Sequence, residues 1–247
     1  MRKEELKLIA FSLMTGGEYH KITELIKVEA TPIPEALEKA KDIKNVITIF
    51  DEDYPKKLRE LKFPPYVLFY KGDKSLLNKK TVSIVGSRLL DDEAYVTKAT
   101  KALCDKLNKN NTIVVSGLAK GVDALAHDFA EKSIGVLGCG IDFIYPYDNA
   151  RLFAKLEQTG LIISEYPERT KPLSFHFPFR NRIIAALGDE MYVMSSKQAS
   201  GTITAINDTL ELQKDVFVLP YSAFSGNYNN TLIDDGARVI NLSKEGK

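Results

Sequence analysis

The sequence predicts an α/β protein built on a Rossmann-like, doubly wound, mainly parallel sheet, with a small helical unit at the N-terminus. Three observations predict it. Short runs rich in Val and Ile recur from residue 81 onward, segments with helical periodicity alternate with them, and glycine or serine follows most of the runs. Strands that are apolar along their whole length belong to sheets covered on both faces, and alternation with helices makes such strands parallel.

The elements of this core follow one another in a regular order. The segment 93–108, for example, places Val96, Ala99, Leu103 and Leu107 on one helical face. Strands are expected at 82–85, 112–115, 134–137, 161–164, 191–195 and 216–219, with a last strand-like run at 238–242. Helices are expected at 93–108, 122–132 and 151–158, from residue 180 onward, and at 203–213.

Residues 1–80 have a different pattern. Helical stretches at 3–14 and 20–28 precede the proline-containing turn 31–34, and a further helix follows it. After an apolar run at 46–50, the strand-like segment 66–70 is expected to extend the main sheet at one edge. We therefore divide the chain into a small helical N-terminal unit, residues 1–45, and a Rossmann-like domain, residues 46–247.

The composition is that of an ordinary globular protein. The 247 residues are 44% hydrophobic and 27% charged, and 34 Lys and Arg against 33 Asp and Glu leave a net charge of +1. Binding to a polyanion would therefore need a local basic patch. The two cysteines, Cys104 and Cys139, lack metal-ligand spacing, so no disulfide or metal site is expected. No apolar run is long enough for a bilayer, and a cytoplasmic location is expected by default.

Small and basic residues follow the predicted strands, where the carboxyl ends of a parallel sheet form a ligand crevice. Glycine lets the backbone approach an anion closely, and hydroxyl groups add donors. These turns together predict an extended surface that follows phosphate groups. The turns are 86–88, 116–121, 138–142 and 199–202, and their candidate ligands are Ser87, Arg88, Ser116, Gly117, Lys120 and Gly121.

The segment 175–184 is the most informative stretch of the chain, because it combines three phenylalanines with two arginines and an amide. Arginine forks suit phosphate oxygens and exposed aromatic faces suit unstacked bases, so single-stranded nucleic acid is the best candidate ligand. Two arginines two positions apart on a helix do not face the same way, so one can bind phosphate while the other is a structural clamp. The candidates here are His176, Phe177, Arg180, Asn181 and Arg182, with Lys197 at a later strand end, a position equally typical of a solvated loop.

Other ligands and chemistries are less well supported. The turn at 86–88 is not G-x-G-x-x-G, and no G-x-x-x-x-G-K-[ST] loop is present, so NAD and ATP are not favoured, whereas a mononucleotide stays open. Asp123 and His127 lie four residues apart and share a helical face. They could act as an acid–base pair, but a structural network is the favoured interpretation.

Several motifs between residues 50 and 240 resemble the DNA-processing protein A (DprA/Smf) family. The most specific is 176–185, His-Phe-Pro-Phe-Arg-Asn-Arg-Ile-Ile-Ala. The others are 54–55 with 64–69, 85–88, 115–127, 136–142 with Tyr145-Pro146, 163–167, 215–220 and 232–237.

The resemblance implies a protein of natural transformation that is not an enzyme. It would bind incoming single-stranded DNA, form a homodimer and help to load RecA, with no cofactor and no membrane partner. By position, Arg88, Lys120, Arg180 and Arg182 would hold phosphates, Ser87, Ser116, Gly117, Gly121 and Asn181 would offer polar contacts, and Phe177 would stack on a base.

The chain departs from the family pattern in four ways. The segment 200–205 is one residue shorter than in the family, and Tyr147 stands where a basic residue is common. The winged-helix domain that many members carry at the C-terminus is expected to be absent. The N-terminal unit is short, which suggests a trimmed SAM-like domain.

Three functions follow from these observations. The leading hypothesis is a single-stranded DNA-binding recombination mediator without covalent chemistry. A phosphoribohydrolase-like enzyme acting on nucleoside monophosphates is the alternative, and it would need Asp123, Asp142 or Glu165 to activate water. The third is a dimeric scaffold whose site has degenerated.

Overall fold

The computed structural model describes residues 2–242. The first residue of the predicted N-terminal unit, Met1, and the last five of the predicted Rossmann-like domain, 243–247, lie outside the described residues. The centre of the structure is a nine-stranded sheet in the order β1-β2-β6-β5-β4-β3-β7-β8-β9. The strands are β1 (Val46–Thr48), β2 (Val67–Gly72), β3 (Thr81–Gly86), β4 (Ile113–Ser116), β5 (Ser133–Val136), β6 (Leu161–Ser164), β7 (Met191–Ser195), β8 (Val216–Val218) and β9 (Arg238–Val239).

The sheet is parallel from β6 to β9, whereas β1 and β2 are antiparallel additions at one edge. The mainly parallel, doubly wound fold is thereby confirmed, and so is the prediction that 66–70 extends the sheet at an edge. The chain starts the parallel sheet at β3, adds β4 to β6 on one side, and then returns to place β7 against the other side of β3. The strand order therefore reverses between β3 and β7, where parallel sheets form their ligand crevice.

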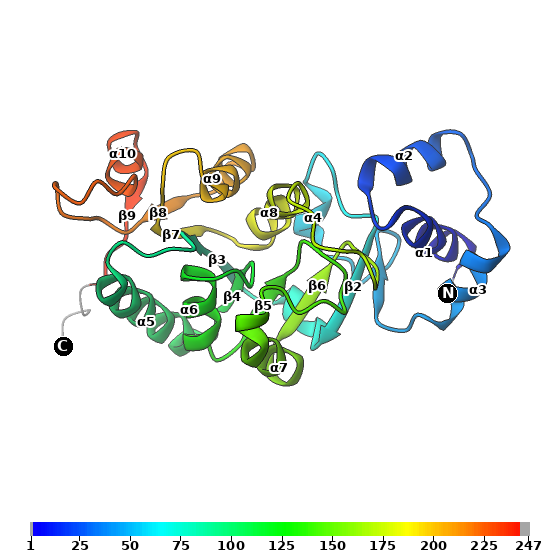
Figure 1. The fold of residues 1–247 in the computed structure, drawn as a ribbon, viewed down its shortest axis with the longest axis horizontal. Coiled ribbons are helices and arrows are strands. Elements are labelled where there is room, and N and C mark those ends of the chain that lie inside the picture. The colour runs from blue at the N-terminus through cyan, green and yellow to red at the C-terminus, as the bar shows by residue number, and fades with distance from the viewer. Residues whose placement is uncertain (1, 243–247) are drawn as a thin grey trace.

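Helices cover both faces of the sheet (Figure 1). One face carries α5 (Glu93–Lys109), α6 (Val122–Phe129) and α7 (Ala150–Thr159), and the other carries α4 (Lys56–Arg59), α8 (His176–Leu187) and α9 (Gly201–Glu211). The alternation within single strands explains this division. Val82 and Ile84 of β3 pack with α5 and α6, whereas Val85 packs with α8 and α9.

The N-terminal helices α1 (Lys3–Thr15), α2 (Tyr19–Lys27) and α3 (Pro34–Asp42) lie beside the β1–β2 edge (Figure 1). Leu8 and Phe11 of α1 share a buried cluster with Val67 and Phe69 of β2. The helical unit thus packs on the sheet through apolar side chains, and the division at residue 45 stays a prediction.

Some element boundaries differ from those predicted. Helix α8 begins at His176 rather than at residue 180, because Pro178 lies in its first turn, where a missing N–H costs no helical hydrogen bond. Helix α6 ends at Phe129 rather than at 132, since the chain must become extended at Ala130 to enter β5. Strand β9 stops at Val239 rather than at 242. A short helix, α10 (Asn229–Asp234), precedes β9.

Candidate anion-binding crevice

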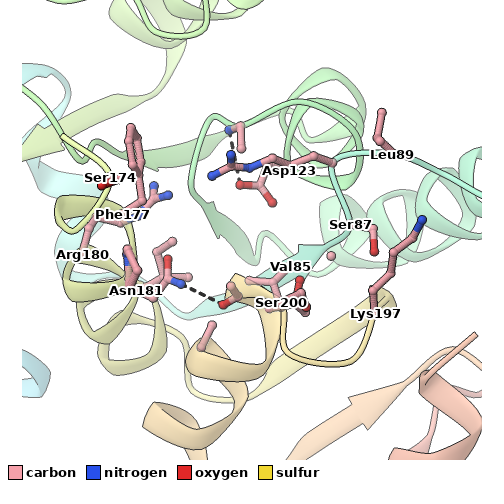
Figure 2. A pocket seen from close by; sticks show the side chains of 18 of the residues that line it. Val85, Ser87, Leu89, Asp123, Ser174, Phe177, Arg180, Asn181, Lys197 and Ser200 are labelled. Carbon is pink, nitrogen blue, oxygen red and sulfur yellow. Dashed lines mark hydrogen bonds between the residues drawn. The ribbon is translucent and has the colours of Figure 1, made fainter. Parts of the chain in front are cut away.

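A crevice of about 620 Å³ lies at the carboxyl edge of the sheet, at the reversal between β3 and β7. Its walls come from the turn after β3, the first half of α8, and the loop that joins β7 to α9 (Figure 2). Six of the residues predicted from the sequence line it, namely Ser87, Arg88, Phe177, Arg180, Asn181 and Lys197.

The turn after β3 is held against the start of α6 by Gly121. This residue has a φ of +72°, and a Cβ there would lie 2.7 Å from the carbonyl oxygen of Arg88. A side chain is therefore excluded both by the backbone conformation and by the close approach of the turn. The backbone N–H of Val122 donates to the carbonyl of Ser87 at 3.2 Å, which completes the attachment. Gly121 thus lets the chain hold Ser87 and Arg88 in place, and it does not line the crevice itself.

Arg180 lies beneath the crevice and is only 4% exposed. Its Nη1 donates to the carbonyl of Gly117 at 2.8 Å and to that of Val136. Asp123, also buried, accepts hydrogen bonds from the backbone N–H groups of Gly117 (3.2 Å) and Ala119 (3.3 Å). Burial raises the pKa of Asp123, and the nearby charge of Arg180 acts in the opposite direction.

Several donors at the crevice are left without partners among the described residues. They are the hydroxyl groups of Ser87 and Ser200 and the Nε of Arg180. The N-terminus of α9 opens beside them, and Ser200 makes no side-chain cap there. Asn181 fixes this end of α9, since its Nδ2 donates to the carbonyl of Gly201 at 3.0 Å. Unsatisfied donors around a positive helix terminus are suited to an anion.

Aromatic and basic side chains stand at the mouth of the crevice. The guanidinium carbon of Arg88 lies 5.7 Å from the ring centre of Phe177, and Arg88 is exposed with no carboxylate partner in the described part of the chain. Tyr145 lies 5.5 Å from Phe177, centre to centre, and is 46% exposed. Sequence reasoning did not select Tyr145 as a ligand, because only the fold brings residues 145 and 177 together. Lys197 is also exposed and pairs with Asp91 at 3.0 Å.

The other predicted residues do not line the crevice. Arg182 donates to both oxygens of Glu165, at 2.6 and 2.5 Å, and to the carbonyl of Phe63 at 2.9 Å, so it is the structural clamp of the two arginines. His176 is buried and stacks on Tyr166 with ring centres 4.0 Å apart. Ser116 and Gly117 are buried in the β4–α6 turn, and Lys120 is exposed and pairs with Asp148.

His127 takes part in a buried polar pair and not in the crevice. Its Nδ1 lies 2.9 Å from the hydroxyl of Ser133, and burial lowers the pKa of the imidazole to about 3. These contacts match the structural interpretation of the Asp123–His127 spacing. Among the described residues no cluster of side chains suited to a metal ion occurs, and none of the helices could span a bilayer.

The fold and the crevice place this protein in a class of Rossmann-like proteins with a ligand crevice at the carboxyl edge of the sheet. Arginine, lysine, aromatic and hydroxyl side chains line the crevice. The sequence profile of the DNA recombination-mediator protein A family matches residues 45–245, and the chain belongs to this family. The resemblance to DprA and Smf proteins is thereby confirmed.

Individual relatives agree with this assignment. The DNA processing protein DprA of Bacillus subtilis is 36% identical over 203 residues, which cover 79% of this chain and 68% of that protein. The structure of DprA from Streptococcus pneumoniae has a TM-score of 0.77 at 31% identity, with 96% of this chain and 92% of that chain covered. The DNA processing protein A of Helicobacter pylori, in a structure concerned with its single-stranded DNA binding mode, has a TM-score of 0.74 at 34% identity and covers 80% of this chain and 92% of its own.

We expect Arg182→Ala to lower the free energy of unfolding by about 3–5 kcal/mol, because it leaves the buried carboxylate of Glu165 without a partner. Urea titration followed by circular dichroism measures the change. The double variant Arg182→Met with Glu165→Met should lose less, since no charge is left unpaired. A change of under about 0.5 kcal/mol for Arg182→Ala, as for ordinary surface substitutions, would contradict the clamp.

We expect His127 to make the protein less stable as the pH falls below 6.5. The unfolded chain takes up a proton on His127 near pH 6.5, whereas the folded state resists it until about pH 3. Stability is therefore lost on acidification, by roughly 2–3 kcal/mol between pH 6.5 and 4.5. Urea titrations across this range should give a shallower pH dependence for His127→Gln, and parallel curves for the two proteins would refute the assignment.

Proposed function

We propose that this protein is a single-stranded DNA-binding recombination mediator that protects incoming single strands and helps to load RecA during natural transformation. The observation that carries the proposal is the juxtaposition of the exposed Arg88 and the half-buried ring of Phe177 at the mouth of a crevice with unpartnered donors. A phosphate would meet Arg88, Ser87 and the N-terminus of α9, while a neighbouring base would stack on Phe177. The family and the DNA-binding relative from Helicobacter pylori support this choice of ligand.

The proposal includes no covalent chemistry. A phosphoribohydrolase-like enzyme would need a carboxylate in the crevice that is free to activate water. Of the three candidates only Asp123 lines the crevice, and each of the three accepts hydrogen bonds from the protein. Asp123 accepts two backbone N–H groups, Glu165 is paired with Arg182, and Asp142 accepts from the backbone N–H of Arg169 at 2.9 Å. Carboxylates held in this way support a binding role over hydrolysis. The homodimer and the RecA contact form part of the proposal on the strength of the family alone.

The experiment that tests the proposal is fluorescence anisotropy with a labelled dT oligonucleotide and a matching duplex, each at two salt concentrations. We expect tight, salt-sensitive binding that favours the single strand, because unstacked bases and phosphates are both needed for full contact. No binding to either form would overturn the proposal. A nucleotide turnover screen would then decide between the enzyme and a degenerate scaffold.

Arg88→Ala should weaken binding of the dT oligonucleotide and lower the slope of log affinity against log salt by roughly one contact, about 0.7 for a single strand. The loss should be similar for other sequences, because phosphate contacts carry no base information. Arg238→Ala is the control, since this exposed arginine pairs with Asp215 at the amino ends of β8 and β9. A slope unchanged by Arg88→Ala would count against a phosphate contact.

Phe177→Ala should cost roughly 1–3 kcal/mol of binding free energy with the salt slope unchanged, because a stacked ring contributes without releasing counterions. Phe177→Tyr keeps the stacking face and should bind within about threefold of the original protein. The same anisotropy titrations measure both variants. Original affinity for Phe177→Ala would assign the ring to packing against Tyr145 and Gly138 instead.

A further inference from the structure

A second crevice, of about 540 Å³, lies between α8, α9 and the segment 60–63. Two of its walls are helix faces, formed by residues spaced three or four positions apart. One wall consists of Pro178, Phe179 and Arg182 of α8 with Phe175 just before that helix, and the other consists of Thr204, Asp208 and Glu211 of α9 with Leu212 just after it. Pro178 also lines the first crevice, so it stands between the two.

Aromatic rings form one side of the second crevice. Phe175 is 58% exposed, so more than half of its surface is open to solvent. Phe63 and Phe179 lie 6.4 Å apart, centre to centre, and the guanidinium of Arg182 covers one face of Phe179 at 3.7 Å. The remaining ring surface is suited to a flat group or a cation.

The charge of the second crevice is opposite to that of the first. Three carboxylates line it, those of Glu60, Asp208 and Glu211, against one lysine among the described lining residues, Lys62, whose Nζ lies 5.3 Å from the ring centre of Phe63. The charge of Arg182 is already neutralised by Glu165. A DNA phosphate would be repelled here, whereas a positively charged group would be attracted.

Asp208 is the residue lining this crevice whose side chain has a buried polar atom without a partner among the described residues. That atom is one of its carboxylate oxygens. The pKa of Asp208 is raised to about 6, mainly by burial and also by the charge of Glu211, whereas the charge of Arg182 opposes both effects. A carboxylate in this condition gains most from a charged donor, because such a donor both neutralises it and supplies the missing hydrogen bond.

We propose that the second crevice binds an arginine side chain presented by a protein partner. The guanidinium would donate to Asp208 and Glu211 while its plane lies against Phe63 and Phe175. A planar fork that stacks on rings and pairs with carboxylates distinguishes arginine from lysine. An apolar peptide would leave Asp208 without a donor, and single-stranded DNA would bring phosphates against three carboxylates. The inference goes beyond the proposed function and is independent of it.

The experiment is a titration of ¹⁵N-labelled full-length protein with Nα-acetyl-arginine amide, followed by NMR. The matched probe is Nα-acetyl-citrulline amide, which has nearly the same shape and no charge. We expect saturable shifts at Thr204, Asp208 and Leu212 with the arginine probe only, and none at Ser87. Asp208→Asn should weaken the arginine probe by about tenfold or more, since a hydrogen bond to a charged group is lost.

Glu211→Gln provides a second test, because it removes a charge on the same wall and does not depend on the folding of Asp208→Asn. We expect it to weaken the arginine probe by about threefold to tenfold. Both variants should bind dT oligonucleotides as the original protein does. Equal shifts with citrulline, an arginine affinity unchanged by either substitution, or stronger binding of cytidine than of the arginine probe would overturn the proposal. Tight cytidine binding would mark the crevice as a base pocket instead.

Discussion

The guanidinium of Arg180 attaches helix α8 to the carboxyl edge of the sheet, and the geometry of the first crevice depends on this attachment. Nη1 reaches the carbonyl of Gly117 after β4 and that of Val136 at the end of β5, so a single side chain joins the helix to two neighbouring strands. The space that it fills is the reason for glycine at 117. A Cβ there would lie 2.7 Å from Nη2 of Arg180 and from a carboxylate oxygen of Asp123. The arginine and the glycine therefore require each other.

A buried charge of this kind is tolerated only with a compensating charge and hydrogen bonds. Asp123 provides the charge, and the backbone N–H groups of Gly117 and Ala119 hold it in place. The pair does not use every donor, because Nε of Arg180 has no partner among the described residues. A spare donor thus lies under the crevice, while the charge of Arg180 is compensated by Asp123. The positive charge that an anion would meet comes from the exposed Arg88 at the mouth, which is how a chain with a net charge of only +1 can present a local site for an anion.

The parts of this structure that could be predicted from sequence are those with a local cause. Alternation of β-branched runs with helical periodicity predicted the sheet, and the family motifs led to Arg88 and Phe177. The spacing of Arg180 and Arg182 predicted that they diverge, but not which one lies at the crevice. Glu165, the residue that follows β6, determines this, because it pairs with Arg182 and so holds that arginine away from the crevice. The start of α8 was predicted too late, at residue 180 instead of His176, although a proline such as Pro178 is compatible with the first turn of a helix.

The second crevice could not be predicted, because it joins residues from three separate segments whose proximity only the packing of α8 on α9 creates. Once that packing is present, the divergence of Arg180 and Arg182 has a further consequence. Two positions along a helix correspond to a rotation of roughly 200°, so α8 can line a basic crevice with one face and an acidic crevice with the other. Phosphates would be drawn to the first and repelled from the second. One pair of helices can therefore hold a nucleic acid and a basic side chain together without competition between them.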